Sequence, residues 1–321
     1  MQPCKSFVLA PSPPFRLDLT VWVLRRRPDN IVDRWDGRTY RRILIDKGKP
    51  FEIAAIQLDN SESPRLQITV TGDAATSDKK AFVSTTVERL LGIHIDLAEF
   101  YCLGKKDKLL RVPINQFLGA KPPRFPTYFE TLVNAIACQQ ISLTVGIRLL
   151  NRLTEAFGSI FETDEGIFHS FPCPEDLANV DADRLRRLGL SYQKARYIIG
   201  LARGITEGQI ILREIEKLDD KMAMKYLCDL KGVGRWTAEY FLLRGLGRTH
   251  IFPGDDVGAR NHLRDWLQLS EPMTYDNVRK VIRHWSGFGG LIYFNLLLKS
   301  LTEKGIIKIE EDNANKSKTR L

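Results

Sequence analysis

Two short stretches of the sequence hold residues whose types and spacing could support chemistry. In the first, a proline and a glycine interrupt the chain just before two adjacent carboxylates, Asp255 and Asp256, which open a predicted helix. Helix capping by itself would explain either aspartate taken singly. Because there are two, one can cap the helix while the other points into a cleft, and the pattern does not decide which residue does which.

The second stretch, residues 230–240, contains a Gly-x-Gly turn between two predicted helices. Gly232 and Gly234 allow a tight turn, and the helix that follows begins with unpaired backbone amides. Such amides and the positive end of the helix dipole can bind an anion, which on DNA would be a backbone phosphate. A plain turn between two helices is the alternative that this spacing leaves open.

Two aromatic residues follow the turn. Trp236 and Tyr240 are four positions apart and therefore lie on one face of the predicted helix. Taken alone, such a pair is more typical of a hydrophobic core than of a binding pocket.

The segments that must position these residues fall into two regions. Up to about residue 110, apolar and polar residues alternate in short runs that end at turn-forming residues, which is typical of an antiparallel sheet. The predicted strands are Phe15–Trp22, Arg41–Ile45, Phe51–Leu58 and Arg65–Thr71, with a helix over Ala81–Leu91. We expect one α+β domain in this region.

A proline-rich break over residues 121–126 precedes a region in which apolar residues recur with a helical period of about 3.6. Thr127 and Glu130 form a predicted capping box at the start of the first helix, over 129–141. Further helices are predicted at 143–157, 174–180, 182–188, 192–207, 210–217, 219–229, 236–245, 256–267, 274–283 and 291–304. From residue 127 onward we expect only helices.

The predicted fold class is therefore α+β. A small antiparallel sheet domain with helices occupies residues 1–120, an all-α core occupies 121–308, and 309–321 forms a flexible polar tail.

Composition and charge exclude several classes of protein. The chain of 321 residues is 43% hydrophobic, yet it has no uncharged apolar run of about 18 residues and no signal-peptide pattern. We expect no membrane segment and no secretion, and a location in the cytoplasm or nucleoid, or in the nucleus of a eukaryote. The five cysteines are widely spaced without a CxxC motif, so neither a disulfide framework nor a metal or iron–sulfur site is predicted.

The net charge of +9 is compatible with nucleic acid, an anionic membrane face or acidic substrates. It divides into +4 over residues 1–110, +5 over 111–308 and 0 over 309–321. With no basic tail, any anion site must be built by the folded surface.

Residues 230–260 resemble the helix-hairpin-helix plus Gly/Pro-Asp signature of the DNA glycosylase superfamily (HhH-GPD). Within them, Gly-Arg-Trp-Thr-Ala-Glu-Tyr at 234–240 resembles the branch of 3-methyladenine DNA glycosylase II, the AlkA-like enzymes. The likeness is strong over roughly residues 125–300 and weak over 1–110. It implies two helical subdomains that flank an active-site cleft. Further segments that carry it are 129–150, with Cys-Gln-Gln-Ile-Ser at 138–142, 189–196 and 285–298.

The resemblance implies a monofunctional enzyme that removes alkylated, mainly cationic purines from DNA and leaves an abasic site. Asp256 matches the family's catalytic carboxylate, which stabilises positive charge on the sugar as the N-glycosidic bond breaks. Asp255 would then cap or support the helix. Trp236 stands where a glycosylase with lyase activity has a lysine able to form a Schiff base, so no lyase activity is expected.

The resemblance also implies a wedge that fills the space left by the flipped-out nucleotide. Gln140 matches the wedge position, where the AlkA-like pattern often has an apolar residue, and Gln139 or Ile141 could share this role. Ordinary solvent-facing residues at a helix end are the alternative for the two glutamines.

Aromatic pocket residues are implied as well, because ring faces attract a cationic base. Trp236 and Tyr240 match two of them and Phe288 a third. The sequence Gly-Phe-Gly-Gly at 287–290 departs from the family's usual Trp or Tyr beside Pro and Arg, which leaves the width of the pocket open.

The implied partner is double-stranded DNA that contains damaged bases, bound by a monomer. The predicted phosphate-binding residues are Gly232, Gly234, Lys231 and Arg235, and further basic candidates are Arg148, Arg244 and Arg260. No cofactor or catalytic metal ion is expected, although the hairpin carbonyls could bind a structural monovalent cation.

Two alternatives stay open. The first is a glycosylase for a neutral oxidised or deaminated base, such as 8-oxoguanine or hypoxanthine. The second is a non-catalytic helix-hairpin-helix protein that binds or senses damaged DNA.

Overall fold

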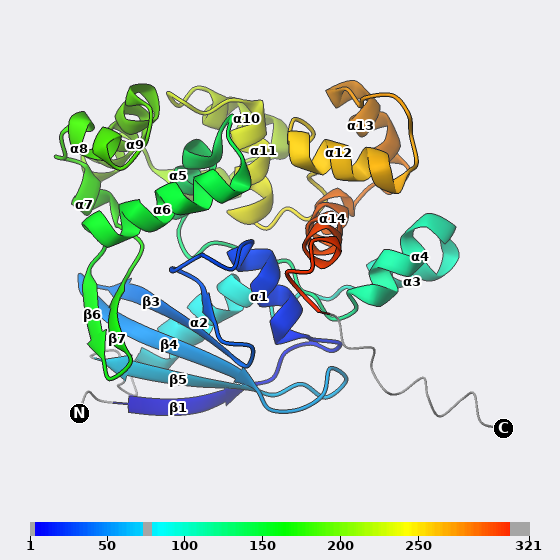
Figure 1. Ribbon diagram of the computed structural model, residues 1–321, viewed down its shortest axis with the longest axis horizontal. Coiled ribbons are helices and arrows are strands. Elements are labelled where there is room, and N and C mark those ends of the chain that lie inside the picture. The colour runs from blue at the N-terminus through cyan, green and yellow to red at the C-terminus, as the bar shows by residue number, and fades with distance from the viewer. Residues whose placement is uncertain (1–3, 73–78, 309–321) are drawn as a thin grey trace.

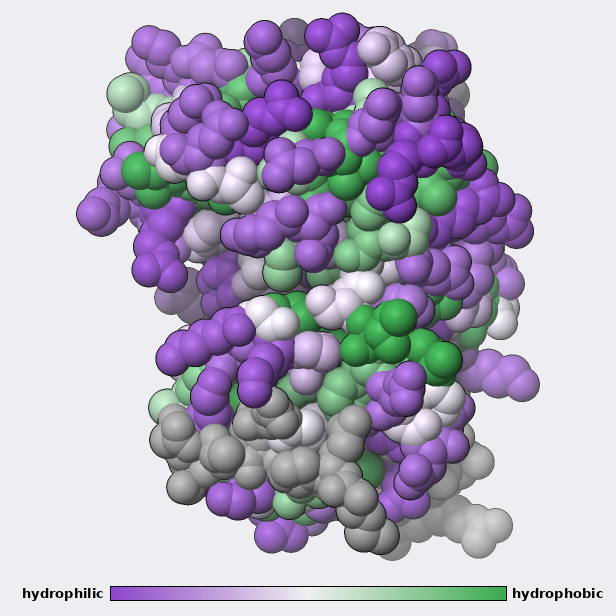
Figure 2. All heavy atoms as spheres, turned by 90° about the vertical axis from the view of Figure 1, so that its left-hand side faces the viewer, coloured by the Kyte–Doolittle hydropathy of each residue, from purple (hydrophilic) through white to green (hydrophobic). Residues whose placement is uncertain are grey.

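The computed structural model describes residues 4–72 and 79–308, in which an N-terminal sheet lies below a group of helices (Figure 1). The tail predicted for 309–321 lies outside the described residues. Hydrophilic residues cover most of the face shown in Figure 2, and hydrophobic residues form small groups between them.

The sheet has five antiparallel strands in the order β1-β5-β4-β3-β2. In β5, buried and half-buried residues alternate, as a strand with one covered face requires. The predictions over 41–45, 51–58 and 65–71 are confirmed by β3, β4 and β5. The strands are β1 (Cys4–Leu9), β2 (Arg34–Trp35), β3 (Thr39–Asp46), β4 (Lys49–Gln57) and β5 (Leu66–Gly72).

The strand predicted over Phe15–Trp22 is wrong, because residues 17–22 belong to helix α1 (Leu17–Arg25). The apolar residues of this segment alternate because α1 packs on two sides: Leu17, Val21 and Leu24 join the core with the sheet, whereas Leu19 and Val23 join a second cluster with the C-terminal helix. Helix α2 (Lys80–Leu91) confirms the prediction over 81–91. Side chains of α1 and α2 pack with those of the sheet into one hydrophobic core.

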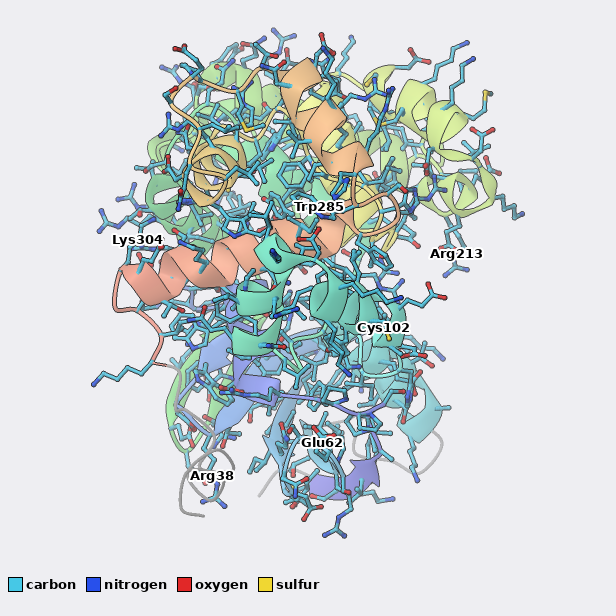
Figure 3. All side chains as sticks on the ribbon, turned by 90° about the vertical axis from the view of Figure 1, so that its right-hand side faces the viewer. Arg38, Glu62, Cys102, Arg213, Trp285 and Lys304 are labelled. Atoms are coloured by element: carbon cyan, nitrogen blue, oxygen red, sulfur yellow. The ribbon has the colours of Figure 1, made fainter. Side chains whose placement is uncertain are left out.

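Two short helices, α3 (Ala98–Lys106) and α4 (Lys108–Gln116), follow, and the sequence patterns did not predict them. Asp107 caps α4, and its Oδ2 accepts a hydrogen bond of 2.7 Å from Trp285 Nε1. In Figure 3, Trp285 lies above the start of α14, at the opposite end of that helix from Lys304, and Cys102 marks α3. Because α3 and α4 pack against the C-terminal helices, the domain boundary at residue 120 stays a prediction.

Helices dominate the chain from Thr127 onward. Thr127 caps α5 as predicted, but Glu130 does not complete the capping box, because its carboxylate pairs with Arg42 of β3 at 2.5 Å. The helices are α5 (Tyr128–Cys138), α6 (Leu143–Phe157), α7 (Pro174–Leu177), α8 (Ala182–Arg187), α9 (Tyr192–Thr206), the 3-10 helix η2 (Leu212–Lys217), α10 (Asp220–Cys228), α11 (Arg235–Arg244), α12 (Val257–Trp266), α13 (Tyr275–Arg283) and α14 (Gly289–Glu303).

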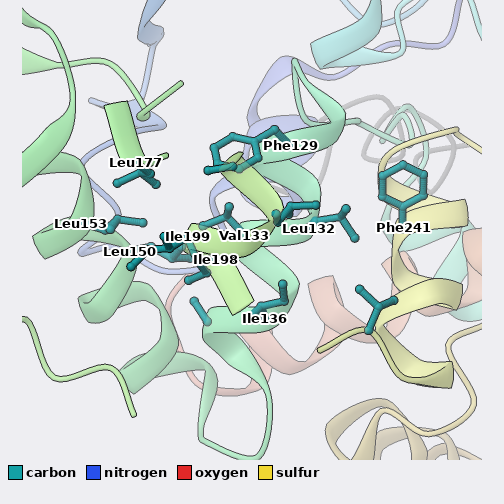
Figure 4. Close-up of a cluster of buried hydrophobic side chains, with 14 of the residues drawn as sticks. Phe129, Leu132, Val133, Ile136, Leu150, Leu153, Leu177, Ile198, Ile199 and Phe241 are labelled. Carbon is teal, nitrogen blue, oxygen red and sulfur yellow. The ribbon is translucent and has the colours of Figure 1, made fainter. Parts of the chain in front are cut away.

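The largest apolar cluster joins α5 to the helices around it. Figure 4 shows Leu132 and Ile136 of α5 between Phe241 of α11 on one side and Ile198 of α9 and Leu150 of α6 on the other. All five side chains are at most 3% exposed. This packing fixes α11, and with it the hairpin, relative to the turn between α5 and α6.

The expectation of helices alone after residue 127 is wrong in one place. Strands β6 (Ile160–Thr163) and β7 (Gly166–His169) form a hairpin that extends from the helical region down to the sheet (Figure 1). Phe161 is 5% exposed, and the guanidinium of Arg34 lies 3.6 Å from the ring centroid of Phe168. Isoleucine and phenylalanine favour an extended chain, although Ile160 and Ile167 are 57% and 62% exposed and only Phe161 is buried.

Candidate active site

The predicted site residues converge on a cleft of about 1160 Å³. The turn between α5 and α6 forms one wall, and the hairpin before α11 forms the next. The start of α12 and the middle of α14 complete the cleft, and Arg26 reaches it from the end of α1. The lining residues used below are Arg26, Gln140, Lys194, Trp236, Asp256 and Tyr293.

The carboxylate of Asp256 joins three elements. Its Oδ1 accepts a hydrogen bond of 2.9 Å from the backbone amide of Ala259 and so caps α12. Its Oδ2 accepts hydrogen bonds from Trp236 Nε1 at 3.2 Å and from Tyr293 OH at 2.9 Å. One oxygen therefore fixes the side chain on its helix, while the other is oriented by two aromatic residues of the cleft.

Of the two roles predicted for Asp255, helix cap or support, the cap is wrong, because Asp256 caps α12. The carboxylate of Asp255 accepts a hydrogen bond of 2.6 Å from Arg235 Nε instead and links the start of α12 to that of α11. Asp256 both caps and faces the cleft because its two oxygens point in different directions, so no division of roles between the two aspartates is needed.

Glu239, which the sequence patterns did not indicate, holds the loop before Asp256. Its Oε2 accepts a hydrogen bond of 2.9 Å from the amide of Gly254, and its Oε1 accepts one of 2.6 Å from Tyr275 OH. Burial raises the pKa of Glu239, and these hydrogen bonds only partly oppose that effect. Residues 237–244 of α11 are all buried, so the helix has no polar face, and a single glutamate within it gives no signal of this role in the sequence.

The hairpin turn differs at its two glycines. Gly232 has φ +86°, and a Cβ there would lie 2.3 Å from the ring of Tyr197 on α9, so both the backbone and the packing require glycine. Gly234 has an extended backbone and caps α11, and a Cβ there would have no atom within 4 Å. Open space therefore lies over the first amides of α11.

The two basic residues beside the turn differ as well. Lys231 is exposed. Arg235 pairs with Asp255, and its guanidinium stacks 3.6 Å from the ring centroid of Tyr275. Contact with a phosphate would therefore require Arg235 to share its charge with Asp255.

The three wedge candidates lie in the turn after α5 but in different environments. Gln139 is half-buried, and its Nε2 donates to the carbonyl of Gly232 at 2.8 Å and to Thr237 Oγ1 at 2.9 Å. Gln140 and Ile141 are exposed in the cleft, and Gln140 has φ +56°. Gln139 therefore ties the turn to the hairpin, and the next two residues are the ones that protrude.

Lys194, at the start of α9, holds the same turn. Its Nζ donates hydrogen bonds to the carbonyl of Ala137 at 2.9 Å and to that of Gln139 at 2.7 Å. The side chain satisfies carbonyls at the C-terminal end of α5, where a positive charge is favourable.

Trp236 and Tyr240 pack against each other, with ring centroids 5.5 Å apart. Tyr240 is only 3% exposed and belongs to the core between sheet and helices, yet it also lines the cleft. Tyr240 is therefore both a core residue and a residue of the cleft, so the two interpretations of its spacing do not exclude each other.

Two predictions for the site are wrong. Phe288 does not line the cleft but packs on Phe100 of α3, with 5.6 Å between ring centroids, because it precedes the first turn of α14. The aromatic residue that α14 contributes to the cleft is Tyr293. Arg244 is fully buried, and its Nη2 donates to the carbonyl of Val23, so it does not reach DNA. Of the other basic candidates, Arg148 is exposed.

Within residues 4–72 and 79–308, no group of three or more His, Cys, Asp or Glu side chains is arranged to bind a metal ion. No helix in the same ranges is long and apolar enough to cross a membrane.

Comparison with known proteins identifies the family. The profile of the HhH-GPD superfamily of base excision DNA repair proteins matches residues 133–286, which include the hairpin and Asp256. The Bacillus subtilis protein YfjP, whose assignment as a DNA-3-methyladenine glycosylase is provisional, is 33% identical over 288 residues, covering 89% of this chain and 96% of that one. The chain belongs to the HhH-GPD superfamily.

Two further similar proteins indicate the branch of the superfamily. A DNA-3-methyladenine glycosylase of Bacillus subtilis is 31% identical over 201 residues, which cover 63% of this chain and 66% of the relative. The structure of a 3-methyladenine DNA glycosylase from Archaeoglobus fulgidus superposes with a TM-score of 0.79 at 26% identity, over 91% of this chain and 98% of that one. Within the superfamily, this chain falls in the AlkA-like branch.

Proposed function

We propose that this protein is a monofunctional DNA glycosylase. It flips an alkylated purine of the 3-methyladenine or 7-methylguanine type out of double-stranded DNA, hydrolyses the N-glycosidic bond and leaves an abasic site. The observation that carries the proposal is the Asp256 carboxylate, which Trp236 and Tyr293 orient inside a cleft between the hairpin and the exposed turn after α5.

The chemistry follows from the charge of this carboxylate. As the bond between base and sugar breaks, positive charge develops on the sugar, and a fixed carboxylate lowers the energy of that state. The hydrogen bonds from Trp236 and Tyr293 hold Oδ2 in place, so little reorganisation is needed during the reaction. The same carboxylate can orient the attacking water.

Three further elements serve DNA binding. The open amides after Gly234, with Lys231 beside them, bind a backbone phosphate. Gln140 and Ile141 fill the space that the flipped nucleotide leaves. The face of Trp236 stacks on the base in the cleft, where a cationic alkylated base gains most from an aromatic ring.

The absence of lyase activity is part of the proposal. A lyase needs an amine that forms a Schiff base with the sugar. Trp236 occupies the position on the hairpin helix where such a lysine stands in lyases, and Lys194 in the cleft is engaged by two backbone carbonyls. We also place the protein with the chromosome, in a nucleoid or a nucleus, where it acts as a monomer.

The test compares neighbouring carboxylates in the full-length protein. Asp256→Asn is expected to bind a duplex that contains 7-methylguanine but to release almost no free base in a single-turnover assay. Asp255→Asn is the matched control, because that carboxylate pairs with Arg235, and it should retain most of the release. Unchanged release by Asp256→Asn would refute the assignment, and strand nicking without added lyase would refute the monofunctional mechanism.

A further inference from the structure

A buried arginine from the N-terminal region forms part of the cleft wall. Arg26 follows α1 and is 5% exposed, and it lines the cleft. Its Nη1 donates a hydrogen bond of 3.0 Å to Tyr240 OH, and its Nη2 donates one of 2.6 Å to Asn134 Oδ1. The guanidinium is therefore fixed against an aromatic residue of the proposed base pocket.

The charge of Arg26 is not neutralised by a hydrogen-bonded carboxylate in the part of the chain that the structure describes. Both acceptors named above are neutral, and an arginine keeps its charge at any physiological pH. The nearby buried carboxylates, Asp33 and Glu130, pair with Arg42 instead. The deep side of the base pocket thus carries a fixed positive charge.

A second buried arginine strengthens this effect. The guanidinium of Arg244 lies 5.7 Å from the ring centroid of Tyr240, and its Nη2 donates to the backbone carbonyl of Val23. Tyr240 is therefore flanked by two cations. Two positive charges in a low-dielectric setting disfavour a cationic base edge on this side of the pocket, whereas Trp236 and the carboxylate of Asp256 favour positive charge on their side of the same cleft.

The hydrogen bonds also define which groups this side can accept. The oxygen of Tyr240 accepts from Arg26, which leaves the hydroxyl hydrogen of Tyr240 to donate elsewhere. Tyr293, by contrast, donates its hydroxyl hydrogen to Asp256. Arg26 and Tyr240 together therefore offer donors, which match a carbonyl oxygen on a purine and not an exocyclic amino group.

We propose that Arg26 is a specificity-determining residue which, with Tyr240, selects alkylated purines that carry a carbonyl oxygen. 7-Methylguanine has such an oxygen, whereas 3-methyladenine has an amino group at the same ring position. A site that supplies donors to a substrate oxygen discriminates strongly against an analogue that lacks it. This inference rests on the proposed glycosylase function and names the preferred substrate class.

The experiment separates base charge from the carbonyl group with four duplexes. 7-Methylguanine is cationic with a carbonyl, 3-methyladenine is cationic without one, hypoxanthine is neutral with a carbonyl, and 1,N6-ethenoadenine is neutral without one. Single-turnover release is measured for the full-length wild type and for Arg26→Met. The ratio of the two rates for each base cancels the intrinsic lability of its glycosidic bond.

The expected result is a pattern across the four bases. Arg26→Met should slow the release of hypoxanthine by roughly 10- to 100-fold, the factor for loss of one charge-assisted hydrogen bond. Release of 7-methylguanine should fall less, because the repulsion of its charge is relieved as well. Release of 3-methyladenine should stay equal or rise, and that of ethenoadenine should not change.

A second variant keeps the inference falsifiable if Arg26→Met does not fold, which circular dichroism would show. Tyr240→Phe retains the ring and removes only the hydroxyl group, and it should slow the two carbonyl bases selectively. An equal change for all four bases in the folded variants would overturn the role of Arg26. Failure of the wild type to release any of them would instead overturn the proposed function.

Discussion

The indole N–H of Trp236 donates a hydrogen bond of 3.2 Å to Oδ2 of Asp256, 20 positions further along the chain. The bond joins the first turn of α11 to the residue that caps α12. The aromatic residue that is proposed to stack on the flipped base therefore also orients the proposed catalytic carboxylate. Tyr293 donates to the same oxygen from α14, so three helices determine where that charge lies.

Removal of either donor should slow catalysis more than binding. Tyr293→Phe keeps the ring, which packs edge-on against Phe252 with centroids 5.8 Å apart, and removes only the hydroxyl group. We expect the single-turnover release rate to fall by roughly 10- to 100-fold, as for one hydrogen bond to a charged group. The Kd for damaged duplex, measured by fluorescence anisotropy, should stay within about twofold of the wild-type value.

Trp236→Phe provides the companion variant. Because Trp236 and Tyr293 donate to one oxygen, the double variant should lose less than the product of the two single losses. A release rate for Tyr293→Phe equal to that of the wild type would contradict the role of these donors.

The two glycines of the hairpin should respond differently to alanine. Gly232→Ala places a methyl group 2.3 Å from the ring of Tyr197 at φ +86°, so we expect it to destabilise the fold by about 2 kcal/mol. Gly234→Ala meets no atom within 4 Å and should change stability by less than about 0.5 kcal/mol.

The functional effect of Gly234→Ala should nevertheless be measurable, because its methyl group occupies the space where a phosphate approaches the amides of α11. Urea unfolding measures the stability, and titration of undamaged duplex measures the binding. Wild-type affinity in Gly234→Ala would show that DNA does not approach this turn.

Substitution of the two glutamines after α5 should have different effects, on stability at Gln139 and on base flipping at Gln140. Gln139→Ala removes hydrogen bonds to Gly232 and Thr237 and should lower the free energy of unfolding by about 1–2 kcal/mol. Gln140→Ala should leave that energy unchanged but reduce flipping, which a 2-aminopurine probe opposite the lesion reports. If Gln140→Ala flips the base as well as the wild type does, Ile141 is the wedge.

The buried Lys121 should make the free energy of unfolding depend on pH in the alkaline range. Its side chain is 1% exposed, its Nζ donates to the carbonyl of Ile95 at 2.8 Å, and burial lowers the pKa of Lys121 from 10.5 to about 8. Between these two values the unfolded chain binds more protons than the folded one, so the free energy of unfolding should rise with pH. The contribution amounts to at most about 3 kcal/mol.

Lys121→Met isolates this contribution, because the variant cannot bind that proton. Urea unfolding of both proteins between about pH 7 and pH 10.5 should show that the free energy of unfolding of the wild type increases relative to that of the variant as the pH rises. A constant difference over this range would mean that the pKa of Lys121 is not lowered by folding.

Local sequence patterns predicted many of the helices and strands, because these elements form through interactions between residues that are close in the sequence. The strand-like run over 51–58 and the alternation over 65–71 predicted two central strands, and the boundaries of α6 at Leu143 and Phe157 were predicted to the residue. The same reasoning failed at α1 and at the β6–β7 hairpin. Helix α1 is buried against two different apolar clusters, and the β6–β7 hairpin is exposed or half-buried apart from Phe161, so neither segment has the single buried face on which a periodic signal depends.

By itself the sequence determined the two motifs, the superfamily and the identity of Asp256 and Trp236 as candidate site residues, because their spacing is set by one turn and two adjacent helices. Only the tertiary structure decided that Asp256, and not Asp255, caps α12, and that Tyr293 takes the place in the cleft that was predicted for Phe288. It also brought Arg26 to Tyr240, 214 positions away. Hydrogen bonds and packing between distant segments produce no local pattern in the sequence, so they could not be predicted from it.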